Sequence, residues 1–170
     1  MQSPATSDDA EVALNELRRL VQGLRTSSHA VERSLGISGA QLFVLRELAA
    51  EPGVSIRRVS ERTLTDPSSV STVVSRLVER GLVTRRQQET DARASRLVVS
   101  RKGAALLARA PEPYQARVIA ALRGLPPLRL REFRLALNEV VDALQLERSE
   151  APLFFENESN EKKKRRAERR

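Results

Sequence analysis

The sequence contains no cysteine and no tryptophan, and it has one histidine, His29. The absence of cysteine excludes disulfides, thiolate metal sites, thiol nucleophiles and cysteine-based redox sensing. A single histidine disfavours metal binding and histidine-based acid–base chemistry, and no Gly-rich phosphate loop or nucleophile–base set is visible. We therefore expect a protein that is not an enzyme and that needs no cofactor or metal.

Long apolar runs are also missing. No stretch of about eighteen consecutive apolar residues occurs, and the N-terminus lacks the basic and apolar regions of a secretory signal. We therefore expect a soluble, cytoplasmic protein with no membrane contact. Its 170 residues suffice for one domain of ordinary size with an appended tail.

The charge is basic but unevenly distributed. Thirty basic and 22 acidic residues give a formal net charge of +8, of which about +5 lies in the last ten residues, EKKKRRAERR. The excess suggests a polyanionic partner, although the whole-chain charge says little about the folded part. The basic run after Lys162 is either a source of nonspecific DNA affinity or a flexible solubilising end.

The apolar periodicity predicts a mostly α-helical chain with one β-hairpin. A long amphipathic helix carries Leu14 to Leu35 and ends at Gly36, and shorter helices are expected over 39–49, 55–63 and 67–80. Two β-branched segments, LVTRR at 82–86 and SRLVVS at 95–100, predict a hairpin with QQETDARA between them. Further helices are expected after Ser100, from Tyr114 and after LPP at 125–127, where the apolar stripe is Phe133, Leu137, Val140, Val141 and Leu144. This order predicts a winged helix-turn-helix with helical extensions at both ends.

The helix over 67–80 has the composition of a DNA-reading helix. Asp66 is a good N-cap and Pro67 suits the first helical position. An inward stripe of Val70, Val73, Val74 and Leu77 leaves an outer face of Ser68, Ser69, Ser71, Thr72, Ser75 and Arg76. Serine and threonine are only moderate helix formers, so helix propensity does not explain their presence on this face. Short polar side chains, however, let a helix approach DNA bases closely. The alternative is an ordinary solvated face.

Arginines are expected to flank this outer face. Candidates for phosphate contacts are Arg57, Arg58 and Arg62 before the reading helix and Arg85 and Arg86 after it. Near the hairpin tip, Arg93 is placed to enter a minor groove, where a narrow width favours arginine. Asp91 has the wrong charge for a phosphate, so we expect it to orient a guanidinium or to fix the turn. A solvated hairpin is the alternative.

The stretch DARASRLVVSRKG resembles the wing signature of the MarR family of transcriptional regulators, with Asp-x-Arg, an apolar strand, Ser100 and then Gly103. GISGAQLFVLRELA, SIRRVSERTLTDPSSVSTVVSRLVERGLVTRR and LPPLRLREFRLALNEVVDAL resemble the second helix, the reading module and the last helix of that family. The ordered set covers about residues 10–146.

The resemblance implies an obligate homodimer on double-stranded DNA. It divides the chain into a dimerisation helix at 1–36, a winged helix-turn-helix module at 37–100, dimerisation helices at 101–146 and, from composition, a disordered basic tail at 147–170, with LFF at 153–155 as a potential exception. Two modules would grip a pseudo-palindrome whose half-sites lie about 34 Å apart. The reading role carries over to Ser68, Ser69, Ser71, Thr72 and Arg76, the minor-groove role to Arg93 and a wing-stabilising role to Asp91.

The resemblance also implies a small effector. Members of the family commonly release DNA when a phenolic or anionic compound binds between the dimer helices and the winged module. Residues that could line such a cleft are Arg25, His29, Phe43 and Tyr114, each also consistent with a core or rim position. We therefore predict a sequence-specific DNA-binding regulator, with repression favoured, and keep a winged-helix protein-interaction module without specific DNA binding as the alternative.

Overall fold

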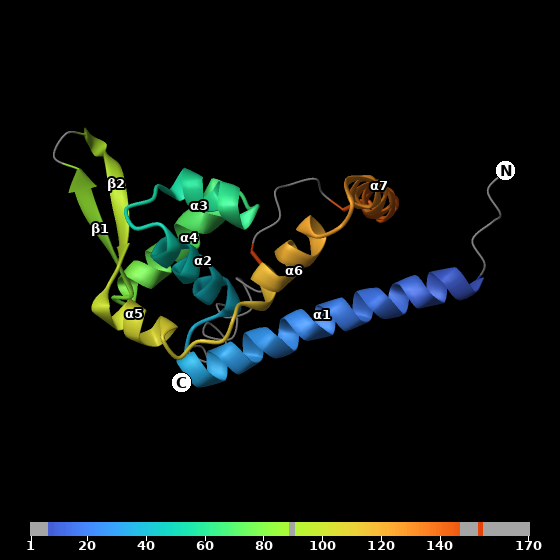
Figure 1. Ribbon diagram of the computed structural model, residues 1–170, viewed down its shortest axis with the longest axis horizontal. Coiled ribbons are helices and arrows are strands. Elements are labelled where there is room, and N and C mark those ends of the chain that lie inside the picture. The colour runs from blue at the N-terminus through green and yellow to red at the C-terminus, as the bar shows by residue number, and fades with distance from the viewer. Residues whose placement is uncertain (1–6, 89–90, 147–152, 155–170) are drawn as a thin grey trace.

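The computed structural model describes residues 7–88, 91–146 and 153–154. Within these residues the chain forms helices and a two-stranded sheet in the order α1 (Ser7–Leu35), α2 (Gly39–Ala50), α3 (Ile56–Thr63), α4 (Pro67–Glu79), β1 (Val83–Gln88), β2 (Asp91–Val99), α5 (Arg101–Leu107), α6 (Tyr114–Arg123) and α7 (Pro127–Ala143). This order confirms the predicted mostly α-helical winged helix-turn-helix with helical extensions (Figure 1).

The core lies where α2, α3, α4 and the base of the sheet meet (Figure 1). On α4 the buried side chains are Val70, Val73, Val74 and Leu77, which confirms the predicted inward stripe. Helix α2 is the central element and buries most of its length, including Phe43. Because the core fills one face of α4, the opposite face remains for other contacts.

Local signals determine where these helices begin and end. Ser38 and Gln41 form a capping box at the start of α2, with N–H···O distances of 3.2 and 3.1 Å. Ser55 caps α3 and Ser100 caps α5 through their hydroxyl oxygens. After α1, Gly36 has a φ of 70°, a left-handed conformation that favours glycine and stops the helix.

The wing is an antiparallel hairpin in which Val83 pairs with Val99 and Arg85 with Leu97. Its strands are longer than predicted, so that Asp91 and Arg93 belong to β2 instead of a polar connection. The difference arises because backbone pairing in a hairpin extends strand structure into polar residues of low intrinsic β propensity. A bridge between Val54 and Leu97 joins the base of the wing to the segment before α3.

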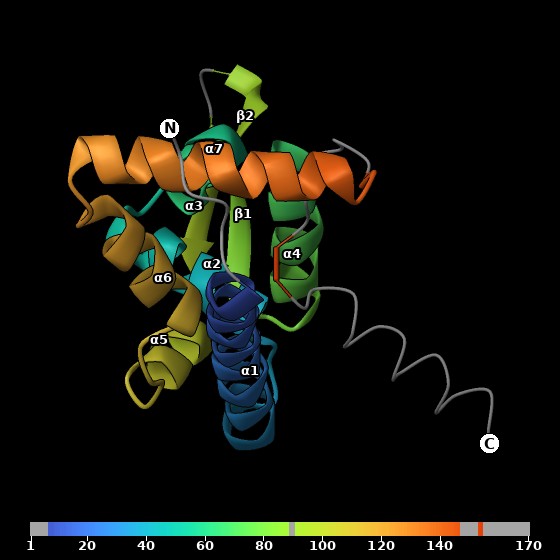
Figure 2. The ribbon, with the colours of Figure 1, turned by 90° about the vertical axis from the view of Figure 1, so that its right-hand side faces the viewer.

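The two ends of the chain form extensions from this module. Figure 2 shows α7 crossing above α1, and Figure 1 shows α1 projecting away from the module. The described part of α1 is exposed from Asp8 to Gln22, where the predicted stripe residues Leu14, Leu17 and Val21 lie, whereas Leu24 and Val31 are buried. No residue of α7 is buried. Of the predicted tail, only Leu153 and Phe154 lie within the described residues, and Leu153 packs into the core.

Candidate nucleic-acid interface

The N-terminus of α4 is organised by Asp66. Its Oδ1 accepts hydrogen bonds from the Ser69 backbone N–H at 2.8 Å and from Ser68 Oγ at 2.5 Å. The hydrogen bond from Ser68, followed by those from Ser69, lowers the pKa of Asp66 to about 2. Asp66 therefore stays ionised at neutral pH, where the positive end of the helix dipole also stabilises its charge.

The outer face of α4 places the predicted reading residues together. Ser68 and Thr72 are exposed, and the remaining four, which are half-buried, are Ser69, Ser71, Ser75 and Arg76. Thr72 Oγ1 donates to the Ser68 carbonyl at 3.0 Å. A hydroxyl that donates one hydrogen bond keeps acceptor lone pairs, so Ser68 and Thr72 can still accept from a base amino group.

The wing is tied to α4 by Arg85. Its Nη2 donates to Ser75 Oγ at 3.1 Å, which links β1 to the last turns of the helix. Arg85 is exposed and extends the same surface. The side chains of Arg86, Asp91 and Arg93 lie outside the described residues, so their expected DNA contacts stay predictions.

The base of the wing is held by a small motif that precedes α5. Ser100 Oγ donates to the Gly81 carbonyl at 2.7 Å and accepts from the Gly103 N–H at 3.1 Å. The Ser100 N–H donates to the Leu82 carbonyl at 2.9 Å. A Cβ on Gly103 would lie 2.3 Å from the Leu82 carbonyl oxygen, so only glycine fits this contact without a shift.

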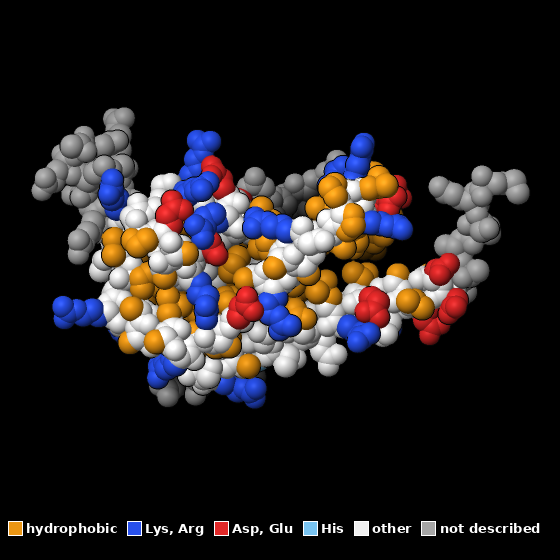
Figure 3. Space-filling model, viewed as in Figure 1, with side chains coloured by type: hydrophobic (Ala, Val, Ile, Leu, Met, Phe, Trp, Pro, Cys, Tyr) orange, Lys and Arg blue, Asp and Glu red, His pale blue; other side chains and the backbone are white. Residues whose placement is uncertain are grey.

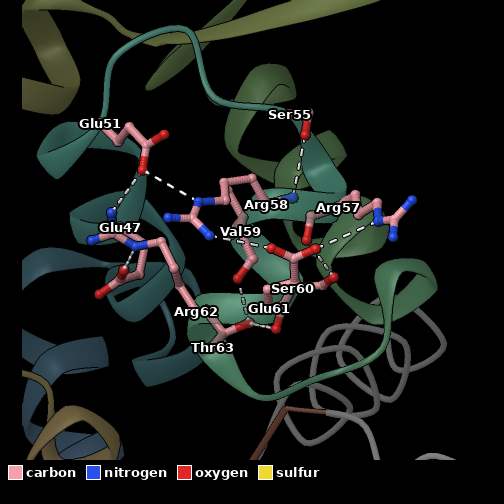
Figure 4. Close-up of polar contacts among 10 residues, drawn as sticks. All are labelled: Glu47, Glu51, Ser55, Arg57, Arg58, Val59, Ser60, Glu61, Arg62 and Thr63. Carbon is pink, nitrogen blue, oxygen red and sulfur yellow. Dashed lines mark hydrogen bonds and ion pairs between the residues drawn. The ribbon is translucent and has the colours of Figure 1, made fainter.

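Two arginines of α3, Arg58 and Arg62, form ion pairs with carboxylates at the C-terminal end of α2, as Figure 4 shows. Arg62 Nε donates to Glu47 at 2.5 Å and its Nη1 donates to Glu51 at 3.0 Å. The hydrogen bond to Glu47 is the main reason that the pKa of Arg62 lies above its usual value. Both carboxylates form ion pairs with the guanidinium group of Arg62, and Arg62 therefore links α3 to α2 in this structure.

The other two arginines of α3 differ in their surroundings. Arg58 lies 3.7 Å from Glu51 and 3.3 Å from Glu61. Arg57 has a largely exposed side chain and one ion pair, with Glu61 at 3.4 Å. Arg57 is thus the α3 arginine best placed for a phosphate, and both predicted phosphate contacts remain untested.

A cavity of about 670 Å³ separates α2 and α3 from α6. The residues that line it include Phe43, Glu47, Arg58, Arg62, Ile119 and Arg123. This volume suits a small-molecule ligand, and a lining that mixes apolar side chains with guanidinium groups suits an aromatic anion.

The four predicted effector residues are not gathered at this cavity. Phe43 lines it, whereas Tyr114 lines two other hollows beside α1 and α6. Arg25 and His29 are exposed on α1. Sequence analysis missed the cavity residues Ile119 and Arg123, because nothing in their local pattern indicates that α6 folds back over α2 and α3.

Within the residues that the structure describes, no group of three or more histidine, aspartate or glutamate side chains is placed to hold a metal ion. None of the described helices is both long enough and apolar enough to cross a bilayer.

Comparisons with known proteins agree with this architecture. Residues 35–94 match the model of the MarR family. The HTH-type transcriptional repressor Rv2887 of Mycobacterium tuberculosis is 27% identical over 134 residues, which cover 79% of this chain and 96% of that protein.

Solved structures show the same fold. Sco3205, a MarR family transcriptional regulator from Streptomyces coelicolor crystallised in complex with DNA, has a TM-score of 0.58 at 19% identity, with 85% of this chain and 92% of that chain covered. The transcriptional regulator BldR from Sulfolobus solfataricus has a TM-score of 0.52 at 20% identity, with 82% and 99% covered.

Proposed function

We propose that this chain, whose residues 35–94 match the model of the MarR family of transcriptional regulators, is a member of that family and a cytoplasmic, sequence-specific DNA-binding repressor. The observation that carries the proposal is the outer face of α4, where hydroxyl side chains and Arg76 gather opposite a fully buried stripe. Repression is favoured because the relative from M. tuberculosis is a repressor.

The proposed reading geometry is that of a winged helix-turn-helix. Helix α4 enters the major groove through Ser68, Ser69, Ser71, Thr72, Ser75 and Arg76, and Arg57, Arg58, Arg85 and Arg86 contact phosphates. Arg93 enters the adjacent minor groove from β2, and Asp91 supports the wing. The hydrogen bond between Arg85 and Ser75 supports this arrangement, because it links the wing directly to the reading helix.

A homodimer is proposed because both helical extensions expose apolar faces to solvent. Residues 1–36 and 101–146 form the dimerisation part and residues 37–100 the DNA-binding module. On α1 and around α7 the large hydrophobic side chains that face solvent are Val12, Leu14, Leu17, Leu20, Val21, Leu125, Leu128, Phe133, Leu135, Leu137, Val140, Leu144 and Leu146. Figure 3 shows hydrophobic side chains over α7 and along α1. An apolar surface of this extent marks a protein interface.

The DNA-binding proposal is tested by gel shift with the DNA upstream of the protein's own gene. Affinity should fall steeply as salt rises, and Arg93→Ala should weaken binding by about tenfold or more. The control Arg19→Ala removes the same charge from an exposed pair with Glu16 on α1 and should leave affinity almost unchanged. Absence of a shift at low salt would favour the protein-interaction module instead.

The cavity beside α6 is the proposed site of a small aromatic or anionic effector. Ligand binding there would alter the angle between α6 and the α2–α3 pair, and hence the spacing of the two modules in a dimer. Benzoate and hydroxybenzoates are suitable probes in the same shift assay. We expect DNA release that Arg123→Ala weakens without changing DNA affinity in the absence of probe. Unchanged DNA binding with every probe would remove the effector from the proposal.

A further inference from the structure

The C-terminal segment returns to the body of the protein after α7. Helix α7 ends at Ala143 without a buried residue, yet Leu153 is 2% exposed and belongs to the hydrophobic core. Phe154 beside it is 51% exposed. A leucine so completely buried ten residues beyond an exposed helix indicates a specific docking position.

The segment docks at a cleft where three helices meet. Phe154 lines it together with Leu24 and Val31 of α1, Leu42 of α2 and Tyr114 at the start of α6. The remaining free volume is about 20 Å³, room for about one water molecule. With Phe154 at its wall, and Leu153 anchored in the adjoining core, the cleft retains little free space.

Two glycines allow the helices to approach at this cleft. A Cβ on Gly23 would lie 2.4 Å from the Tyr114 hydroxyl oxygen, and one on Gly39 would lie 3.3 Å from Ser28 Oγ. The walls of the cleft therefore come from close contacts of α1 with both α2 and α6. A ligand seated between them fixes the orientation of α1 and α6 relative to the winged module.

We propose that this cleft is a peptide-binding site whose ligand is the chain's own Leu153–Phe154 segment. The segment acts as an apolar clasp that holds the helical extensions against α2. Because nine residues separate α7 from Leu153, docking is intramolecular, and short tethers give effective concentrations of about a millimolar. In the wild-type protein, a free peptide of the same sequence must therefore compete with the chain's own segment for the site.

Tyr114 provides a direct reporter of docking. It is the single tyrosine of the chain, which has no tryptophan, so the intrinsic fluorescence comes from this residue alone. Tyr114 is half-buried beside Phe154 in the cleft. Loss of the clasp should expose the ring to a soluble quencher such as acrylamide.

The first experiment uses Leu153→Asp in the full chain. We expect acrylamide quenching of Tyr114 to rise about twofold and the Tm to fall by about 5 °C, because a buried leucine is lost. Leu153→Met should behave as wild type. The control Leu64→Asp alters a leucine that is 63% exposed in the turn before α4 and should not change Tyr114 quenching. Should Leu153→Asp fail to fold by circular dichroism, Leu153→Ala must show the same changes at smaller amplitude.

The second experiment adds a synthetic peptide of residues 147–159. It should bind Leu153→Asp and restore the wild-type quenching, and it should bind the wild-type protein at least tenfold more weakly. A peptide that carries Asp in place of Leu153 should not bind. Equal binding to both proteins, binding to neither, or unchanged quenching in Leu153→Asp and Leu153→Ala would overturn the proposal. None of these readouts involves DNA, so their failure leaves the proposed function standing.

Discussion

Asp66 is the residue on which the start of the reading helix depends. Its Oδ1 caps α4, and its Oδ2 is buried without a hydrogen-bond partner among the described residues. The sequence predicted the cap from Asp-Pro, because N-cap preferences are local. The hydrogen bond from Ser68 could not be predicted, because the same hydroxyl was equally available to solvent or DNA.

The lowered pKa of Asp66 predicts a pH dependence of stability. A folded pKa of about 2, below the ordinary value of 3.8, means that Asp66 contributes stability above about pH 4 and loses it as the pH falls towards 2. The contribution is on the order of 2 kcal/mol. In urea unfolding between pH 2 and 7, Asp66→Asn, which keeps a capping acceptor but cannot titrate, should show a smaller decline than wild type. Parallel pH profiles would show that Asp66 does not contribute in this way.

Gly103 gives a second prediction for a single residue. Gly103→Ala should lower the free energy of unfolding by about 1–3 kcal/mol, because the added methyl would overlap the Leu82 carbonyl and the Val99 side chain. Gly124→Ala is the matched control, since its Cβ would meet no atom closer than 3.4 Å. Chemical denaturation of both variants measures the difference, and an equal effect at the two positions would contradict the close contact.

At the scale of elements, the ion-paired joint between α2 and α3 supports α4, the proposed reading helix, because both helices pack against it. The α3 arginines were expected to flank DNA because their charge alone suggested phosphate contacts. In the structure Arg62 instead holds Glu47 and Glu51, and Arg58 approaches Glu51. A sequence cannot distinguish these roles, because the partners lie on another helix and are brought near by packing.

We predict that this joint contributes measurably to stability. Arg62→Ala should lower the free energy of unfolding by about 1–2 kcal/mol, because it removes the ion pair of the partly buried Glu47 and leaves Glu51 only the longer contact with Arg58. Arg57→Ala, on the same helix, should change it by less than about 0.5 kcal/mol, because its pair with Glu61 is largely solvated. Thermal or urea unfolding compares the two variants, and similar losses would argue against a specific role for Arg62.

The wing shows that a sequence can predict the presence of a hairpin without predicting the length of its strands. Its existence and position followed from the β-branched segments, whose pattern is local. Its length did not, because the pairing of Gln87 with Ser95 is made between two polar segments that do not resemble strands individually.

At the scale of the whole molecule, α1 and α7 expose apolar faces to solvent in the single chain. The predicted stripe residues Phe133, Leu137 and Val140 are 44%, 41% and 50% exposed. They do not belong to the core of this chain, although their spacing is that of core residues. A helical stripe indicates burial but not whether the burial occurs within one chain or between two.

We predict that Leu137→Asp converts a dimer into monomers at micromolar concentration. In a two-fold interface each substitution occurs twice, so that both copies weaken association, by about tenfold or more for each copy. Analytical ultracentrifugation measures the change, and Leu64→Asp, which alters an even more exposed leucine on the winged module, should remain dimeric. A wild-type protein that sediments as a monomer would contradict the dimer.

The sequence by itself determined the helix starts, the inward stripe of α4, the order of elements and the exclusion of cysteine chemistry, because these depend on residue type and short-range spacing. Tertiary structure alone decided that Arg62 faces α2, that Gly103 meets the Leu82 carbonyl, that α6 closes a cavity and that Leu153 returns to the core. Each of these contacts joins residues far apart in the chain, and local patterns carry no information about which distant segments pack together.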